Sequence, residues 1–231
     1  MPDINVTIGG PWVLTYSDEF NGAANDPPDS AKWVNPSTEN DFPKWDSKFM
    51  SDDAYLDGNS NLVLRAQQRS SGGASYTSGQ ISTEGKFSQT GGRWEARIQM
   101  PAGGSGIWPA YWTLGANWPT GGEIDILESF ADTSKASAFY HYNSGGHQFF
   151  GGQVATGLSG FHTYAAEWDS GTEVRWYLDG VLDQTYTSVN VVSTPMWIQL
   201  DIYIGGPAGS PSGTTFPQYM LVDYVRVYRR A

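Results

Sequence analysis

The sequence predicts an all-β protein, a jelly-roll sandwich of two antiparallel sheets, and three observations support this prediction. About fourteen short segments alternate apolar and polar residues, which is the period of a strand with one buried face. The 28 glycines and 13 prolines supply turns between them. No segment has a helical period or a long apolar run, so neither coiled coils nor membrane-spanning helices are expected. The 231 residues contain no obvious linker, so residues 1–231 are expected to form a single domain.

The alternating segments follow one another along the whole chain. The clearest cover residues 12–16, 61–66, 92–100, 136–143, 161–168, 174–180, 195–206 and 220–229. In the third of these, alternation places Arg93, Glu95 and Arg97 on one face. We expect these three side chains to form a solvated charge ladder across neighbouring strands.

Residues 121–129 alternate acidic and apolar side chains, and this strand carries the candidate chemistry. Period two places Glu123 and Asp125 on one face and the isoleucines between and beside them on the other. Strict alternation would send Glu128 into the core, where an unpaired carboxylate costs too much free energy. A β-bulge at Ile126-Leu127 would return Glu128 to the acidic face. We therefore predict three carboxyl groups in a row on one face.

Three acids on one strand face repel one another, so a solvated outer face or a metal-binding edge is the plain alternative. The segment 108–112, Trp-Pro-Ala-Tyr-Trp, lies just upstream and places Trp108 and Trp112 on one side. Flat rings stack on the apolar faces of pyranoses, and paired carboxyl groups break glycosidic bonds. This combination indicates a sugar-cleaving cleft with both tryptophans binding substrate.

These two segments together resemble the active-site strands of glycoside hydrolase family 16, which includes laminarinases, lichenases, agarases and carrageenases. The spacing Glu-x-Asp-x-x-Glu is similar to the bulged, laminarinase- and agarase-like branch, and the resemblance runs from Val13 to Tyr228. It implies a substrate cleft across the concave sheet. By family position Glu123 is the nucleophile, Glu128 is the general acid/base and Asp125 tunes both. The anomeric configuration would be retained through a glycosyl-enzyme intermediate.

The resemblance also implies further residues of the cleft. His141 is expected to hydrogen-bond the leaving-group side. Gln80 stands where arginine is usual, and it can hydrogen-bond a hydroxyl without bringing a charge. Trp45 lies in the region that borders the non-reducing end, and Asp201 and Tyr203 are expected to line the floor.

A structural calcium is expected at Asp223, because the resemblance places this residue where relatives hold the ion. Backbone carbonyls near Glu19 and near the turn at Gly58 would complete the oxygen ligands that calcium prefers. An ion pair of Asp223 with Arg226 or Lys32 is the alternative. No cofactor is expected for catalysis.

Composition limits the partners. A net charge of −11 argues against nucleic acid and anionic membranes, and it favours neutral over highly sulfated polysaccharides. The absence of cysteine excludes disulfides and thiolate nucleophiles. No signal peptide is visible at the N-terminus, yet a polysaccharide is too large to import intact, so we expect a secreted protein whose signal has been removed. We also expect a monomer.

The sequence therefore predicts a retaining, endo-acting hydrolase of β-1,3-glucan or mixed-linkage β-1,3-1,4-glucan. An agar-type galactan hydrolase of the same fold is the first alternative, because the segment around Trp45 departs from the laminarinase pattern. A non-catalytic lectin and a calcium-dependent structural module are the others. The acid trio argues against the lectin, and the two tryptophans argue against the structural module.

Overall fold

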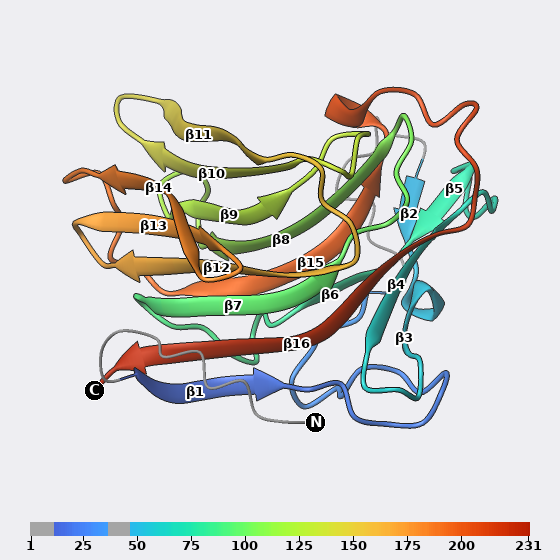
Figure 1. Cartoon of the computed structure of the whole chain (residues 1–231), viewed down its shortest axis with the longest axis horizontal. Helices are drawn as coiled ribbons and strands as arrows, with labels where there is room; N and C mark the ends of the chain where they lie inside the picture. Colours follow the sequence, from blue (N-terminus) through green and yellow to red (C-terminus); the bar gives the residue numbers. More distant parts are fainter. Residues whose placement is uncertain (1–11, 37–46) are drawn as a thin grey trace.

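The computed structural model describes residues 12–36 and 47–231 and arranges them in two β-sheets packed face to face (Figure 1). The larger sheet has ten strands and the smaller has six. Strands pair antiparallel throughout the smaller sheet, and the larger sheet contains one parallel pair, β2 with β5. The sandwich predicted from the alternating pattern is confirmed.

The strands of the larger sheet are, in spatial order, β14 (Val181–Thr187), β13 (Glu173–Leu178), β12 (Phe161–Asp169), β7 (Gly92–Gln99), β16 (Gln218–Arg230), β4 (Leu62–Gln67), β5 (Tyr76–Ser78) and β2 (Ser47–Phe49), with β1 (Trp12–Asp18) beside β16 and β3 (Ala54–Leu56) beside β4. The smaller sheet runs β11 (His147–Ala155), β10 (Ala136–Asn143), β9 (Glu123–Glu128), β8 (Ile107–Gly115), β15 (Met196–Ile204) and β6 (Gln80–Ser82). Helical structure in the described ranges is limited to the 3-10 turns η1 (Ser51–Asp53) and η2 (Gly206–Ala208). Accordingly, no described helix has the length and apolarity that a membrane span requires.

Apolar side chains from the inner faces of both sheets fill the space between them. The larger sheet contributes Trp94, Trp168 and Trp176, which are at most 2% exposed. From the smaller sheet, Ile124 and Ile126 of β9 enter the same core. Burial of each large apolar side chain contributes about 1.5–3 kcal/mol. The apolar face of β9 thus fixes the orientation of its acidic face.

Strand β9 contains a bulge at Ile126. Leu127 lies opposite Tyr111 of β8, while Asp125 lies opposite Trp112, so Ile126 is the extra residue. The register against β10 shifts at the same point. Ile126 and Leu127 both lie in the core. The bulge predicted from the spacing of the acids is confirmed.

Side chains of the larger sheet donate hydrogen bonds to the backbone beside the bulge. Trp176 Nε1 donates a hydrogen bond of 3.0 Å to the backbone carbonyl of Asp125. Gln184 Nε2 donates one of 3.0 Å to the carbonyl of Ala138, which lies at the shifted register of β10. A bulge interrupts the ladder of backbone hydrogen bonds. Donors from across the sandwich therefore satisfy carbonyl groups beside the bulge.

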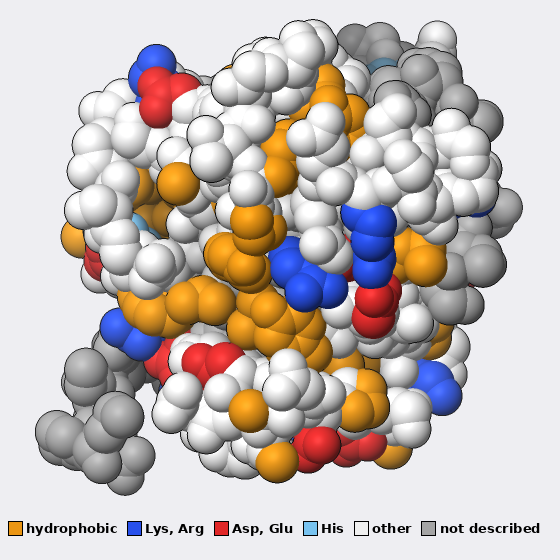
Figure 2. Space-filling model, turned by 90° about the vertical axis from the view of Figure 1, so that its right-hand side faces the viewer, with side chains coloured by type: hydrophobic (Ala, Val, Ile, Leu, Met, Phe, Trp, Pro, Cys, Tyr) orange, Lys and Arg blue, Asp and Glu red, His pale blue; other side chains and the backbone are white. Residues whose placement is uncertain are grey.

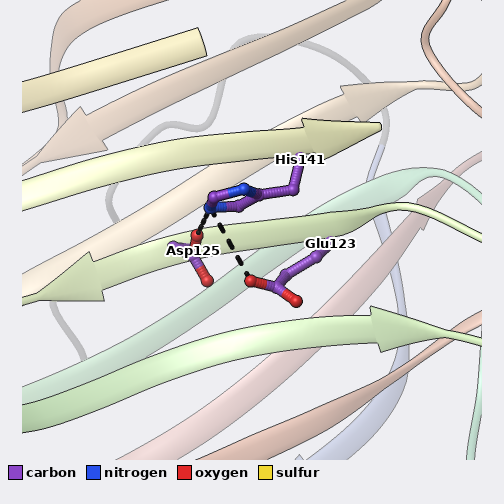
Figure 3. Close-up of side chains that lie close together, drawn as sticks. All are labelled: Glu123, Asp125 and His141. Atoms are coloured by element: carbon purple, nitrogen blue, oxygen red, sulfur yellow. Dashed lines mark ion pairs between the residues drawn. The ribbon is translucent and has the colours of Figure 1, made fainter. Parts of the chain in front are cut away.

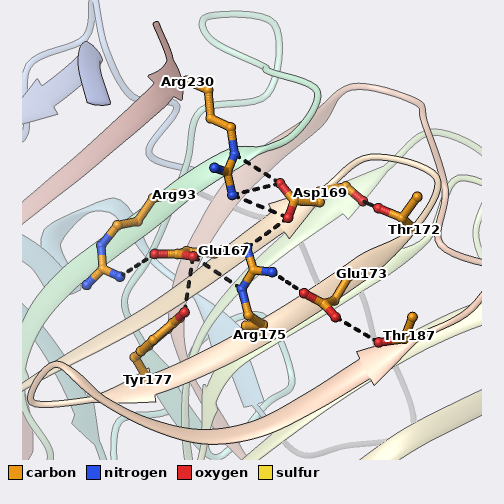
Figure 4. Close-up of polar contacts among 9 residues, drawn as sticks. All are labelled: Arg93, Glu167, Asp169, Thr172, Glu173, Arg175, Tyr177, Thr187 and Arg230. Carbon is orange, nitrogen blue, oxygen red and sulfur yellow. Dashed lines mark hydrogen bonds and ion pairs between the residues drawn. The ribbon is translucent and has the colours of Figure 1, made fainter. Parts of the chain in front are cut away.

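A network of charged side chains lies on the larger sheet (Figure 4). Arg93 donates to Glu95 at 2.7 Å and to Glu167 at 3.2 Å. Glu167 also accepts hydrogen bonds of 3.1 Å from Arg175 and from the hydroxyl of Tyr177. The network therefore joins strands β7, β12 and β13 through paired charges.

The expectation of a solvated ladder is wrong for two of its three residues. Arg93 is only 3% exposed and Glu95 only 6% exposed. The ring of Tyr177 lies 5.1 Å from the Arg93 guanidinium, and the Tyr224 hydroxyl donates to Glu95 at 3.0 Å. The side chain of Arg97 is 41% exposed, as expected. Aromatic residues of β13 and β16 shield the charges, and the local pattern of β7 does not reveal them.

Paired charges also occur at the end of the molecule that carries β2 to β5. Figure 2 shows basic side chains beside acidic ones on this surface, among hydrophobic side chains. Asp53 is fully buried and lies 2.8 Å from Arg65 Nε and 2.8 Å from Arg69 Nη2. The charge of the buried Asp53 is thus neutralised by two guanidinium groups.

Glu167→Gln is expected to lower the free energy of unfolding by about 2–3 kcal/mol, because it removes a carboxylate that pairs with the buried Arg93. Asp169→Asn is the matched control, since Asp169 contacts the same Arg175 at 2.8 Å but its side chain is 33% exposed. Its loss should stay below about 1 kcal/mol. Urea denaturation measures the free energy of unfolding of both variants. Equal losses would contradict the prediction that Glu167 contributes more to stability than Asp169.

Candidate active site

The three predicted acids lie on the face of β9 that points away from the core. Asp125 is 3% exposed and Glu128 is 8% exposed, while the Glu123 side chain is 18% exposed. Glu128 reaches this face because the bulge at Ile126 adds one residue before it. Neighbouring side chains, and not the core, shield the acids from solvent. The structure therefore brings the whole predicted trio together.

His141 of β10 lies opposite Glu123 in the strand pairing. Its Nε2 is 3.1 Å from Asp125 Oδ2 and 3.7 Å from Glu123 Oε1 (Figure 3). Its Nδ1 is 2.8 Å from His147 Nε2, a hydrogen-bonding distance. The structure thus places this predicted site residue directly against two acids of the trio.

Both predicted tryptophans donate hydrogen bonds to carboxylates. Trp108 Nε1 donates to Glu128 Oε1 at 2.7 Å, and Trp112 Nε1 donates to Asp201 Oδ2 at 2.8 Å. Asp201 is fully buried and lies opposite Gln80 in the pairing of β15 with β6. The indoles therefore orient acidic groups in addition to offering ring faces.

Aromatic rings from both sheets gather around Trp108, on the Glu128 side of the trio. The ring of Tyr203 lies 5.2 Å from that of Trp108 and 5.0 Å from that of Phe49. Phe130, which sequence reasoning missed, lies 5.3 Å from Trp108. Tyr203 is 7% exposed and packs within this cluster. Its ring therefore packs against Trp108, the indole that donates to Glu128.

A second aromatic group, missed by the sequence analysis, lies on the Glu123 side. We call Trp118, His147 and Phe149 the exposed aromatic strip. Trp118 is 48% exposed and Phe149 is 61% exposed. His147 lies 4.6 Å from the ring of Trp118 and 6.4 Å from that of Phe149. The spacing His147-x-Phe149 after a glycine pair was a signal that two neighbouring side chains share a face.

Burial raises the pKa of all three acids. The pKa of Glu123 rises to about 9, first through burial and then through the negative charge of Asp125. Asp125 is fully buried beside Glu128, and its pKa lies well above the usual value. Burial raises the pKa of Glu128 to about 7, against the lowering effect of the hydrogen bond from Trp108. Acids that interact this closely share protons, so the trio holds at least one proton near neutral pH.

Two predicted site residues, Asp223 and Trp45, are not found beside the acid trio. Asp223 lies on β16 of the larger sheet. Asp223 Oδ2 is 2.6 Å from Arg97 Nη1. The two alternative partners, Arg226 and Lys32, pair with other carboxylates. A guanidinium at Asp223 neutralises the charge that would attract calcium, so these contacts do not fit the predicted ion. Trp45 lies outside the described residues.

Among the described residues, one group of three or more side chains has the geometry to hold a metal ion. Glu123, Asp125 and His141 each present one ligand atom, and these atoms lie within 4.8 Å of one another. The group consists of two acids of the trio and the histidine that contacts them.

Comparison with known proteins places this arrangement in a family. The model of "Glycosyl hydrolases family 16" matches residues 43–226. A β-glucanase of Rhodothermus marinus is 32% identical over 94% of this chain and 85% of its own length. A keratan-sulfate endo-1,4-β-galactosidase of Sphingobacterium multivorum is 34% identical over 94% of this chain and 55% of its own length.

Two solved structures that resemble this chain are those of laminarinases. The laminarinase of Rhodothermus marinus superimposes with a TM-score of 0.84 at 31% identity, covering 95% of this chain and 98% of that one. The laminarinase catalytic domain of Thermotoga maritima MSB8 gives a TM-score of 0.82 at 31% identity, covering 96% of this chain and 99% of that one. Because the family match spans most of the chain and the relatives align over nearly all of it, this chain belongs to glycosyl hydrolase family 16.

Proposed function

We propose that this glycosidase is a retaining, endo-acting hydrolase of β-1,3-glucan or mixed-linkage β-1,3-1,4-glucan. The observation that carries the proposal is the bulged β9, which presents Glu123 and Glu128 on one face with Asp125 between them. Relatives named β-glucanase and laminarinase support the substrate class. A net charge of −11 imposes no electrostatic penalty on a neutral glucan.

Glu128 acts as the general acid in the first step. Its pKa, raised to about 7, allows it to hold a proton near neutral pH and to donate that proton to the glycosidic oxygen. The carboxylate of Glu123 attacks the anomeric carbon as the bond to the leaving sugar breaks. In the second step Glu128, now ionised, takes a proton from water, and the water oxygen displaces Glu123. Two inversions at the same carbon retain its configuration.

Asp125 and His141 control the charge of the nucleophile. Glu123 must be ionised to attack, although burial and the charge of Asp125 raise its pKa to about 9. One carboxyl oxygen of Asp125 lies within 4.8 Å of one of Glu123, so Asp125 is placed to take its proton. His141 Nε2, at 3.1 Å from Asp125 and 3.7 Å from Glu123, favours the negative charge that remains. Asp125 and Glu123 thus share one proton, and both lie beside His141.

A galactan hydrolase of the agar type is the second candidate. The keratan-sulfate endo-1,4-β-galactosidase relative, at 34% identity, favours it. A non-catalytic lectin fits less well, because sugar binding alone gains nothing from three buried acids that repel one another. Reducing ends released from laminarin, lichenan, agarose and κ-carrageenan distinguish the candidates. We expect release from laminarin or lichenan, and release from agarose alone would replace the glucan proposal.

The reaction itself needs no cofactor, because carboxyl groups and water supply its chemistry. A structural calcium at Asp223 stays a prediction, and the contact of this carboxylate with Arg97 weighs against it. The monomeric state and secretion also stay predictions. Sedimentation analysis and detection of the protein in culture medium would test these two.

Glu123→Gln should lower turnover more than about 100-fold, because it removes the nucleophile. The folded variant should nevertheless be more stable than the wild type at neutral and alkaline pH. A carboxyl group whose pKa is higher in the folded than in the unfolded chain destabilises the fold once it ionises. Here that penalty is absent below about pH 4.5 and grows as the pH rises to about 9. The melting temperatures of variant and wild type should therefore agree near pH ~4, and the variant should melt higher near pH ~8.

Glu173→Gln is the control for this prediction, because Glu173 lies on the larger sheet and pairs with Arg175. It should leave turnover unchanged. Activity of Glu123→Gln above about a hundredth of wild type would remove the nucleophile assignment.

Trp108→Phe should move the alkaline limb of the kcat/KM profile to higher pH by about one unit. The reason is that the indole hydrogen bond lowers the pKa of Glu128, and phenylalanine keeps a ring without the donor. Trp112→Phe is the matched control, since its indole donates to Asp201. Equal shifts in both variants would argue that Glu128 is not the titrating acid.

Phe149→Ala should raise KM for long glucans about 3–10-fold, because a stacking ring on the exposed aromatic strip is lost. The residue is 61% exposed, so the melting temperature should not change. Short oligosaccharides that do not reach the strip should be cleaved as before. Leu182→Ala, at a 51% exposed position of β14, serves as the control. A KM that rises equally for short and long substrates would contradict a role in binding the extended chain.

A further inference from the structure

We propose that Glu123, Asp125 and His141 form a binding site for Zn²⁺ and that an ion bound there reversibly blocks hydrolysis. The binding part of the proposal rests on the geometry of these residues and not on the proposed function. The inhibitory consequence rests on the proposed function, because the site includes the nucleophile. The proposal follows from ligand spacing, from the orientation of His141 and from the burial of Asp125.

The three ligand atoms are spaced close to the edges of a tetrahedron. Zinc bonds to nitrogen and oxygen are about 2.0–2.1 Å long, so tetrahedral ligand atoms lie about 3.3 Å apart. His141 Nε2 lies 3.1 Å from Asp125 Oδ2 and 3.7 Å from Glu123 Oε1. All three atoms lie within 4.8 Å of one another. A small rotation of the Glu123 side chain would bring them to a common ion, with water as the fourth ligand.

The orientation of His141 is fixed by a second histidine. Histidines that bind a metal generally use the other ring nitrogen in a hydrogen bond, which holds the ring in place. His141 Nδ1 lies 2.8 Å from His147 Nε2, and the two rings stack with an interplanar angle of 18°. His141 therefore presents Nε2 to the acids, as Figure 3 shows.

Asp125 supplies a buried oxygen that a cation would satisfy. The residue is 3% exposed, and its Oδ2, which lies 3.1 Å from His141 Nε2, has no hydrogen-bond donor of suitable geometry among the residues that the structure describes. A buried oxygen without a donor costs free energy, and so does the repulsion between Asp125 and Glu123. A divalent ion between the two carboxylates would offset both costs.

The types of ligand atom at this site favour some metal ions over others. One imidazole and two carboxylates suit zinc, which accepts four mixed ligands. Calcium takes six to eight oxygen ligands, and magnesium keeps several waters in a strict octahedron. We therefore expect Zn²⁺ to bind and Mg²⁺ not to bind. A bound ion occupies the Glu123 carboxylate, which is then unable to attack the anomeric carbon.

The binding test uses the intact, metal-free chain without substrate. Calorimetric titration with ZnCl₂ should show one site, and thermal unfolding at about 100 times Kd should give a melting temperature roughly 5–10 °C higher. MgCl₂ at the same concentration should change neither signal. Absence of a zinc signal would overturn the proposal.

Three histidine variants locate the site. His141→Ala should abolish zinc binding, and His147→Ala should weaken it about 10–100-fold, because the ligand loses its orienting partner. His162→Ala is the matched control, since this histidine pairs with Asp179 at 2.7 Å on the other sheet. Unchanged affinity in His141→Ala, or loss of binding in His162→Ala, would overturn the proposal.

Hydrolysis assays separate this inference from the proposed function. If wild type cleaves a glucan, saturating Zn²⁺ should reduce turnover more than tenfold, and a chelator should restore it. An active enzyme that saturating Zn²⁺ leaves unchanged would overturn the inhibitory part. If zinc binds through His141 and no polysaccharide is cleaved without metal, the site stands and the proposed function fails.

Discussion

The active site depends on one extra residue in one strand. A regular strand cannot place Glu123, Asp125 and Glu128 on one face at this spacing, because side chains alternate. The bulge at Ile126 resolves this, and it sends Ile126 and Leu127 together into the core. The irregularity is held from the other sheet, where Trp176 donates to the carbonyl of Asp125. The larger sheet thus supports the site through a hydrogen bond to the backbone of β9.

The same fold treats buried charge in two opposite ways. On the larger sheet, Arg93 and Glu167 are buried within a network in which each charge has partners of opposite sign (Figure 4). On β9, acids are buried beside acids, and burial raises the pKa of each one. The first arrangement limits the cost of desolvating charges. The second keeps protons available at neutral pH, and the packing of the rest of the sandwich must offset its cost.

Function therefore follows from the contacts that differ among the three acids. Glu128 has an indole donor in Trp108, which limits the rise in its pKa. Glu123 and Asp125 share the imidazole of His141 instead. In the proposed mechanism, these different neighbours divide the roles of acid and nucleophile among side chains of similar chemistry. They also create the combination of nitrogen and oxygen ligands that suits a transition-metal ion.

The sequence alone determined which faces the strands present, because period two and the cost of a buried carboxylate are local properties. It therefore predicted the sandwich, the acid trio, the bulge and the positions of Trp108 and Trp112. It did not predict what lies opposite each face. The burial of Arg93 depends on Tyr177, the partner of Asp223 is Arg97, and His141 contacts His147. Such contacts join different strands, and only the packing of those strands in three dimensions decides them.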